Sequence, residues 1–364
     1  KKIPNRATPV VPPGAQSLRH FNAHCTGCQL CVSVCPNQVL RPSGKLMTLM
    51  QPEMSFERGY CRPECTKCAA VCPTRAIALV SGEGGFRHPR VEAAKCVGCG
   101  ACDRVCPIGQ APVLRRPPLR AWAMRHTDAL RAESSSGGAF TALAEVVLAR
   151  GGAVCGAELR LAERRVRHAC VEEAVGLARL RKSKYVQSET EGALRDCLAM
   201  LRAGRPVLFV GTPCQVAGYR LLTASFGPLA LSCDLVCGGV PSPGLFARYV
   251  EEEERRAGAP LVGYDFRDKR AGWNFPNVRL SFANGRTVRR IPGLDPFFAA
   301  YAKKLSIRQT CVGCPFACEK RVGDVTIADC WRVAAYDPAL DDNRGTSLLL
   351  AQTAAGEALS LIHI

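Results

Sequence analysis

The sequence lacks any long uncharged hydrophobic run, and this excludes a membrane-spanning helix within these residues. The longest weakly charged region, residues 206–240, contains Arg220, Asp234, several Pro and several Gly. A membrane-spanning helix needs about 20 consecutive apolar residues. The region therefore predicts buried strands and turns, and we expect no membrane span.

Aromatic residues are also scarce, at 6%, and no long basic tract is interleaved with them. The formal net charge is +18, from 49 Lys and Arg against 31 Asp and Glu, but these cations are scattered along the chain. Nucleic-acid-binding proteins usually gather them on one stripe, so we expect no nucleic-acid partner. An anionic cofactor or an acidic redox partner explains a basic face equally well.

No secretory signal peptide is visible, although the chain holds 22 Cys, 12 of them in its opening third. So many thiols without secretion favour metal ligation over disulfides, in a reducing compartment such as the cytoplasm. The chain starts at Lys1 without Met and ends in Leu-Ile-His-Ile. A lost targeting segment and a truncated carboxyl end therefore stay open.

Three copies of one cysteine motif organise the first part of the chain, each closed by Cys-Pro. Copies one and three have the spacing C-x2-C-x2-C-x3-C-P, and copy two has one extra residue in its first gap. This pattern is typical of 4Fe-4S clusters, whose fourth Cys often binds the neighbouring cluster. Structural zinc usually takes two separated pairs, so it fits poorly. The predicted ligands are Cys25, Cys28, Cys31, Cys35, Cys61, Cys65, Cys68, Cys72, Cys96, Cys99, Cys102 and Cys106. How three motifs share their fourth ligands stays open.

The rest of the chain alternates helical and strand patterns joined by Gly-rich turns, which favours an α/β domain. We expect helices over 140–150, 191–203, 245–256 and 295–304, and strands over 153–159, 206–210, 229–236, 325–328 and 347–351. The acidic run at 251–254 is interpreted as a solvated helix face. The predicted organisation is a ferredoxin-like α+β module over 1–118, then an α/β domain in two parts, 119–205 and 206–364.

Four further cysteines stand out in this second domain by their context. Cys214 and Cys237 each follow a predicted strand, and Cys311 and Cys314 form a C-x2-C pair. Ligands at strand ends can converge on one more cluster, although Cys233, Cys318 and Cys330 compete for these positions. We interpret Cys155, Cys170 and Cys197 as buried structural cysteines.

Three segments of the second domain could bind an anionic cofactor. Residues 133–138 place three Ser and two Gly before a helix. The free N–H groups of such a helix end can donate hydrogen bonds to a phosphate. An ordinary N-cap followed by a turn is the alternative. Residues 181–187 set three cations around Tyr185, and 266–273 set cations beside Trp273. An ordinary solvent-exposed surface explains the 181–187 and 266–273 segments equally well. His126 and His168 are acid–base candidates by residue type only, and we expect ordinary histidines there.

These motifs together resemble the beta-subunit family of coenzyme F-420 hydrogenases and dehydrogenases, over residues 120–357. The resemblance is carried in order by 134–138, 182–188 (KSKYVQS), 211–215 (GTPCQ), 234–243 (DLVCGGVPSP), 266–273 and 311–329. One departure is Gly238, where relatives often have His. The first part is similar to a polyferredoxin module fused ahead of that family.

The resemblance implies an α/β flavin-binding domain with FAD and one 4Fe-4S cluster, in addition to three clusters in the first module. It places the fourth cluster on Cys214, Cys237, Cys311 and Cys314. It implies an enzyme, a flavin- and iron–sulfur-dependent oxidoreductase that passes electrons between a small-molecule hydride carrier, FAD and the clusters. The expected partner is a redox protein or a larger oxidoreductase complex. The flavin contacts it implies are Ser135, Ser136, Gly137, Gly138, Lys184, Tyr185, Gln187, Gly211 and Thr212.

The competing hypothesis is a non-catalytic electron-transfer subunit that docks a separate redox enzyme. The first twelve ligand cysteines fit both hypotheses equally well. No catalytic acid or base is identified from the sequence. The hydride substrate, the direction of electron flow and the oligomeric state also stay open, because related proteins differ in substrate.

Overall fold

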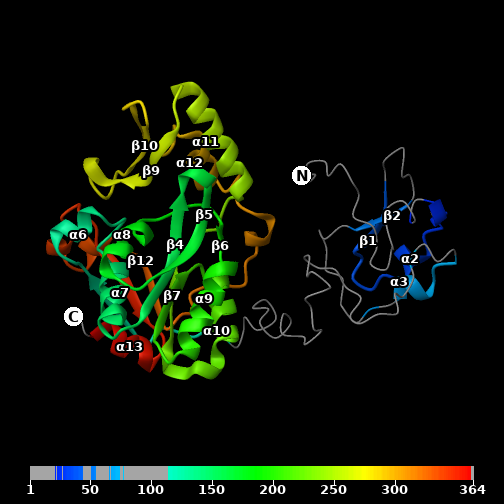
Figure 1. Cartoon of the computed structure of the whole chain (residues 1–364), viewed down its shortest axis with the longest axis horizontal. Helices are drawn as coiled ribbons and strands as arrows, with labels where there is room; N and C mark the ends of the chain where they lie inside the picture. The colour runs from blue at the N-terminus through cyan, green and yellow to red at the C-terminus, as the bar shows by residue number, and fades with distance from the viewer. Residues whose placement is uncertain are drawn as a thin grey trace. The chain divides into compact units, whose positions relative to one another are not determined.

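The structure, a computed structural model, describes residues 21, 23–26, 28–43, 51–54, 65, 67–73, 77 and 114–361. The chain divides into two compact units, residues 1–100 and 101–364, and each is described by itself (Figure 1). The domain boundaries expected from the sequence remain predictions. Five predicted ligands, Cys61 and the whole third motif from Cys96 to Cys106, lie outside the described residues.

The described part of the first unit is small and is built around cysteines. It holds helix α2 (Leu30–Ser33), strands β1 (Leu40–Pro42) and β2 (Pro52–Met54), and helix α3 (Lys67–Ala70). β1 and β2 pair antiparallel, with Leu40 opposite Met54. Phe21, Leu40 and Ile77 form an apolar core against which the cysteines pack. A short strand, β1, thus follows the first Cys-Pro and begins at Leu40. This ferredoxin-like module is the expected one.

The second unit is organised by a mixed sheet of eight strands in the order β3-β13-β12-β8-β7-β4-β5-β6. Its central pairs, β12 with β8, β8 with β7 and β7 with β4, are parallel, and β3, β13 and β5 join antiparallel. This confirms an α/β domain. The strands are β3 (Arg120–Met124), β4 (Ala153–Arg160), β5 (Arg165–Val171), β6 (Ser188–Glu189), β7 (Val207–Gly211), β8 (Ala230–Leu235), β12 (Val325–Asp329) and β13 (Ser347–Ala351).

Alternating side chains along the central strands bury two separate cores, one on each face of the sheet. On β7, Leu208 and Val210 pack into the core that contains residues of α7, α8 and α13. Val207 and Phe209 pack on the other face with residues of α9 and α10. Figure 1 shows these two helix groups on opposite sides of the sheet. The helices are α7 (Ala139–Ala149), α8 (Leu177–Leu180), α9 (Glu191–Arg202), α10 (Pro213–Leu222) and α13 (Ala354–Leu361), with α6 (Asp128–Ala132) before α7.

A second, three-stranded antiparallel sheet carries its own core. It consists of β9 (Leu261–Asp268), β10 (Asn277–Phe282) and β11 (Thr287–Arg290). Helices α11 (Pro243–Ala257) and α12 (Pro296–Ala302) pack on it through Phe246 and Phe297. The interpretation of 251–254 as a solvated face is wrong at Glu253, which is buried and pairs with Arg290 at 2.6 Å. Among the described helices, none has the length and hydrophobicity that crossing a bilayer requires.

Candidate functional site

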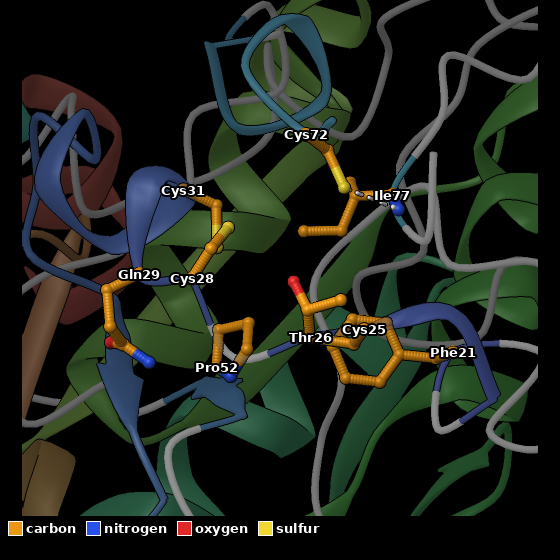
Figure 2. Close-up of a pocket in the computed structure, with 9 residues that line it drawn as sticks. All are labelled: Phe21, Cys25, Thr26, Cys28, Gln29, Cys31, Pro52, Cys72 and Ile77. Atoms are coloured by element: carbon orange, nitrogen blue, oxygen red, sulfur yellow. Dashed lines mark hydrogen bonds between the residues drawn. The ribbon is translucent and has the colours of Figure 1, made fainter. Parts of the chain in front are cut away.

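The first two cysteine motifs are interleaved in space. Cys25, Cys28 and Cys31 of the first motif line a small cavity together with Cys72, the last cysteine of the second motif (Figure 2). Burial, and then the neighbouring thiols Cys25 and Cys28, raise the pKa of Cys31 to about 12. Thiols crowded in this way favour a bound cation, which would stabilise their ionised form. The four residues therefore line one cavity and are together as the prediction of a 4Fe-4S cluster requires.

The reciprocal exchange would involve Cys35, the last cysteine of the first motif. Burial raises the pKa of Cys68, and Cys65 and Cys35 are electrostatic neighbours that add to the rise. Cys35 is thus an electrostatic neighbour of Cys68, and Cys72 lines a cavity with the first motif. Exchange of the fourth cysteine between two motifs is typical of two-cluster ferredoxins. For these two motifs it stays a prediction.

The four cysteines predicted in the second unit come together from three separate segments. Cys214 lies in the first turn of α10, which Thr212 and Gln215 close with a capping box, and Cys237 follows β8. Burial raises the pKa of Cys237, and Cys214, Cys311 and Cys314 are the neighbouring thiols that raise it further. Gly239, whose φ of 99° favours glycine, brings the loop after Cys237 close to Cys311, since a Cβ there would lie 3.3 Å from the Cβ of Cys311.

The competing cysteines have other surroundings. Cys233 is fully buried among the apolar residues of the sheet. Cys318 donates to the carbonyl of Lys320 at 3.1 Å. Cys155, Cys170 and Cys197 form a separate group, with sulfur atoms within 4.8 Å of one another. The sequence does not reveal this grouping, because β4, β5 and α9 contribute one cysteine each.

A cavity of about 350 Å³ lies beside Cys237. Its wall includes the carboxyl ends of the parallel strands β7, β8 and β12, the usual place for a ligand in an α/β sheet. The amino end of α7 and residues 180–186 complete it. Seven of the nine predicted cofactor contacts line this cavity: Ser135, Ser136, Gly138, Lys184, Tyr185, Gly211 and Thr212.

The two remaining predicted contacts do not line the cavity. Gly137 is packed against the backbone of Met124 and Ser347, and its N–H donates to Ser347 Oγ at 2.9 Å. Gln187 donates its backbone N–H to Pro241 O at 3.0 Å. Gly137 therefore shapes the turn, and Gln187 ties the 181–187 segment to the loop that follows Cys237.

The three cations of residues 181–184 line the cavity but already have partners. Lys184 Nζ donates to the carbonyls of Arg179, Leu180 and Arg181, at 3.3, 2.8 and 2.6 Å, and so caps α8. Lys182 pairs with Asp265 at 2.5 Å. Arg181 pairs with Glu133 at 2.5 Å. These side chains therefore shape the wall of the cavity, and the amino end of α7 offers N–H groups to an anion.

One wall of the cavity is an aromatic and ionic group around the buried side chain of Arg267. Its guanidinium is 6% exposed, pairs with Asp329 at 2.6 Å and lies 5.5 Å from the centre of the Trp331 ring. Trp331 stacks on Trp273 with 4.5 Å between ring centres, and Trp273 Nε1 donates to Asp329 at 3.1 Å. The 266–273 segment is thus partly buried and is not an ordinary solvent-exposed surface. Asp329 and Trp331 could not be assigned to it from the sequence, since about 60 residues separate them from Arg267.

His168 also lines the cavity, from β5. Its Nε2 lies 3.0 Å from Val210 O, and burial lowers its pKa to about 4. A carbonyl can only accept, so Nε2 donates and Nδ1 carries the lone pair of a neutral ring. His126, in contrast, faces Glu145 at 3.3 Å. A neutral His168 carries no charge, and its Nδ1 can accept a hydrogen bond.

Comparisons with known proteins identify both parts of the chain. Residues 204–361 match the family model for the carboxyl terminus of the coenzyme F-420 hydrogenase/dehydrogenase beta subunit. Residues 24–76 and 60–110 match the 4Fe-4S dicluster domain.

Three similar proteins illustrate these matches. The ferredoxin-type protein NapF of Haemophilus influenzae is 33% identical over 134 residues, 27% of this chain and 74% of that protein. The methylamine utilization ferredoxin-type protein MauM of Methylophilus methylotrophus is 28% identical over 166 residues, 31% of this chain and 74% of that protein. A chain of the F-420-reducing nickel–iron hydrogenase complex of Methanosarcina barkeri is similar in structure, with a TM-score of 0.46 and 16% identity, over 68% of this chain and 79% of that chain.

Proposed function

Because the chain belongs to the coenzyme F-420 hydrogenase/dehydrogenase beta-subunit family and carries a ferredoxin-type 4Fe-4S module, we propose that it is an iron–sulfur flavoprotein oxidoreductase. At the coarser level it is an iron–sulfur electron-transfer protein related to both groups. The finer proposal adds FAD, four 4Fe-4S clusters and a small-molecule hydride carrier. The observation that carries it is the 350 Å³ cavity whose wall includes Cys237.

The donor sets fit the clusters. Each described group offers thiols alone, which suit iron–sulfur clusters and not magnesium or calcium. In the first unit the proposed sets are Cys25, Cys28, Cys31 and Cys72, and the exchanged set that contains Cys35, Cys65 and Cys68. In the second unit the proposed set is Cys214, Cys237, Cys311 and Cys314.

The cavity fits a flavin nucleotide by its size and by its polar groups. Its volume lies in the range of cofactor pockets, about 300–1,000 Å³. The amino end of α7 offers N–H groups for a phosphate. FAD, when bound, would supply conversion between two-electron hydride transfer and single-electron transfer.

The side chains of the cavity then have distinct tasks. Ser135 accepts a hydrogen bond from Ser183 N at 2.8 Å, which joins the α7 turn to the 181–187 segment. Tyr185 packs edge-on against Phe266 and Phe298 and forms part of the cavity wall. Arg267 keeps a positive charge beside the bound ligand, fixed by Asp329. Cys237 would connect the flavin to the cluster for electron transfer, because it lines the cavity and also belongs to the four-thiol group.

A second candidate function is a non-catalytic electron-transfer subunit, which the similarity to ferredoxin-type NapF and MauM favours. It explains the cysteines of the first unit but gives no role to the cavity. In either case the partner would be a redox protein or a larger oxidoreductase complex.

The test is anaerobic purification followed by flavin and iron analysis. We expect one FAD and about sixteen iron atoms per chain, the content of four four-iron clusters. Bound flavin should then be reduced by at least one of NADH, NADPH and reduced F-420. Protein that holds iron and cannot bind flavin would leave the second candidate as the function.

A cavity variant separates the two cofactors. In Gly156→Leu the new side chain enters the cavity from β4, where Gly156 is part of the wall. We expect loss of flavin at unchanged iron content. Gly192→Leu on α9 is the matched control, because a Cβ there meets nothing within 4 Å.

A further inference from the structure

Lys304 adopts a backbone conformation that L-residues rarely take, with φ of 59°. It stands just after α12, where its N–H donates to Tyr301 O at 2.8 Å and Leu305 N donates to Ala300 O at 2.9 Å. A non-glycine residue in the left-handed region persists where its surroundings hold it. Here the turn directs the lysine side chain to the loop after β8, where its ammonium donates to the carbonyl of Gly238 at 2.5 Å.

This ammonium lies where the four-thiol group meets the cavity. Gly238 directly follows Cys237, and Cys237, Gly238 and Tyr301 all line the cavity. Lys304 Nζ is 5.5 Å from the centre of the Tyr301 ring. A Cβ added at Gly238 would lie 2.5 Å from Lys304 Nζ. The ammonium therefore occupies the space that any larger residue 238 would need.

The charge of Lys304 is not neutralised by a carboxylate in the described part of the chain. Two cations that line the cavity are paired, Lys182 with Asp265 and Arg267 with Asp329. A positive charge favours the more negative, reduced form of a nearby redox centre. Lys304 thus brings an unpaired positive charge to the residue that follows Cys237.

We propose that Lys304 is a positioning residue that raises the reduction potential of the centre held by Cys214, Cys237, Cys311 and Cys314, through its contact with the Gly238 carbonyl. This inference rests on the proposed function, which places a cluster at those four cysteines. It assigns Gly238 a matching role, because glycine at this position leaves room for the ammonium.

The test is a redox titration of the anaerobically purified full chain, followed by electron paramagnetic resonance. The signal of this centre is the one that disappears in Cys311→Ser. In Lys304→Gln we expect its midpoint potential to shift to a more negative value, at unchanged iron and flavin content. Lys304→Arg should keep the wild-type potential. A higher salt concentration should reduce the difference in midpoint potential between Lys304→Gln and the wild type.

Lys303→Gln is the matched control, since it removes the same charge from the neighbouring residue. Equal shifts in Lys303→Gln and Lys304→Gln, or no shift in either, would overturn the inference while leaving the proposed function intact. Absence of any signal that depends on Cys311, with correspondingly low iron, would overturn both.

A second variant tests the geometry without changing charge. Gly238→Ala crowds the ammonium out, so it should shift the potential in the same direction as Lys304→Gln. The double variant should shift it no further than Lys304→Gln alone, because both changes remove one contact. Additive shifts would show that the Gly238 contact is not the route by which Lys304 acts.

Discussion

The two groups of cysteines are assembled in different ways. In the first unit the ligands of each motif follow one another within eleven or twelve residues, and only the fourth is exchanged between neighbouring motifs. In the second unit about 100 residues separate Cys214 from Cys314, and strands β7 and β8 and the 309–314 segment must all be in place before the four thiols meet. The first arrangement depends on local sequence and the second on the sheet.

The space beside each group differs as well. The cavity lined by Cys25, Cys28, Cys31 and Cys72 measures about 10 Å³, room for about one water molecule. The cavity beside Cys237 measures about 350 Å³. The described thiols of the first unit therefore have little empty space beside them, whereas Cys237 lies beside a cavity in the size range of organic cofactors. The difference between the two groups leads to four predictions.

The largest effect should come from removing one ligand in each group. Cys72→Ser and Cys237→Ser should each lower the iron content by about four atoms per chain. Only Cys237→Ser should also disturb bound flavin, because only Cys237 lines the large cavity. Iron analysis and flavin absorption measure both effects. Cys330→Ser is the control and should change neither; equal flavin disturbance in both ligand variants would remove the distinction between the units.

A change in the cavity wall should affect the second unit and leave the cysteine group of the first unit unchanged. Asp329→Asn leaves the buried Arg267 guanidinium without its carboxylate, which costs about 3 kcal/mol. We expect a lower urea midpoint for the second unit and weaker flavin binding, with the spectrum of the first unit's clusters unchanged. Glu251→Gln breaks an exposed pair with Arg164 and should cost at most about 0.5 kcal/mol.

A smaller effect is expected from the loop that joins Cys237 to Cys311. Gly239 has φ of 99°, and a Cβ there would lie 3.0 Å from Ile307. Gly239→Ala should therefore destabilise the second unit by about 2 kcal/mol and reduce the iron bound at its four cysteines. Gly258→Ala has a similar backbone strain, at φ of 66°, but meets nothing within 4 Å. Iron loss in both variants would point to general destabilisation instead.

The smallest effect concerns an ion pair of the second unit that is not part of the cavity wall. Arg131, which is buried, donates to Asp342 at 2.5 Å and lowers the pKa of that carboxyl to about 2. A lowered folded-state pKa stabilises the fold above the ordinary value near 4, and this contribution is lost as the pH falls through about 2. Asp342→Asn should thus cost about 1 kcal/mol in urea unfolding, equally at pH 6, 7 and 8. Flavin and iron content should stay unchanged.

Most regular elements of the second unit could be predicted from hydrophobic periodicity and glycine stops. The helix expected over 140–150 is α7, the strand over 153–159 is β4, and the helix over 245–256 is α11. The sequence does not predict the three-stranded sheet β9–β11, since charged residues interrupt all three strands and β11 has only four residues. Glu253 was misjudged for a related reason: its partner Arg290 comes from β11, and a charge run does not reveal which member is buried.

The sequence by itself predicted the twelve thiols of the opening third as cluster ligands, because neighbouring ligands on a short loop need only the right spacing. It also indicated an α/β domain, because that pattern repeats along the chain. Tertiary structure decided that Cys72 joins the first motif, that Cys214, Cys237, Cys311 and Cys314 meet, and that Asp329 and Trp331 stand beside Arg267. It alone placed the ammonium of Lys304 at Gly238. These contacts join residues that are distant in the chain, and only the pairing of strands brings them within reach of one another.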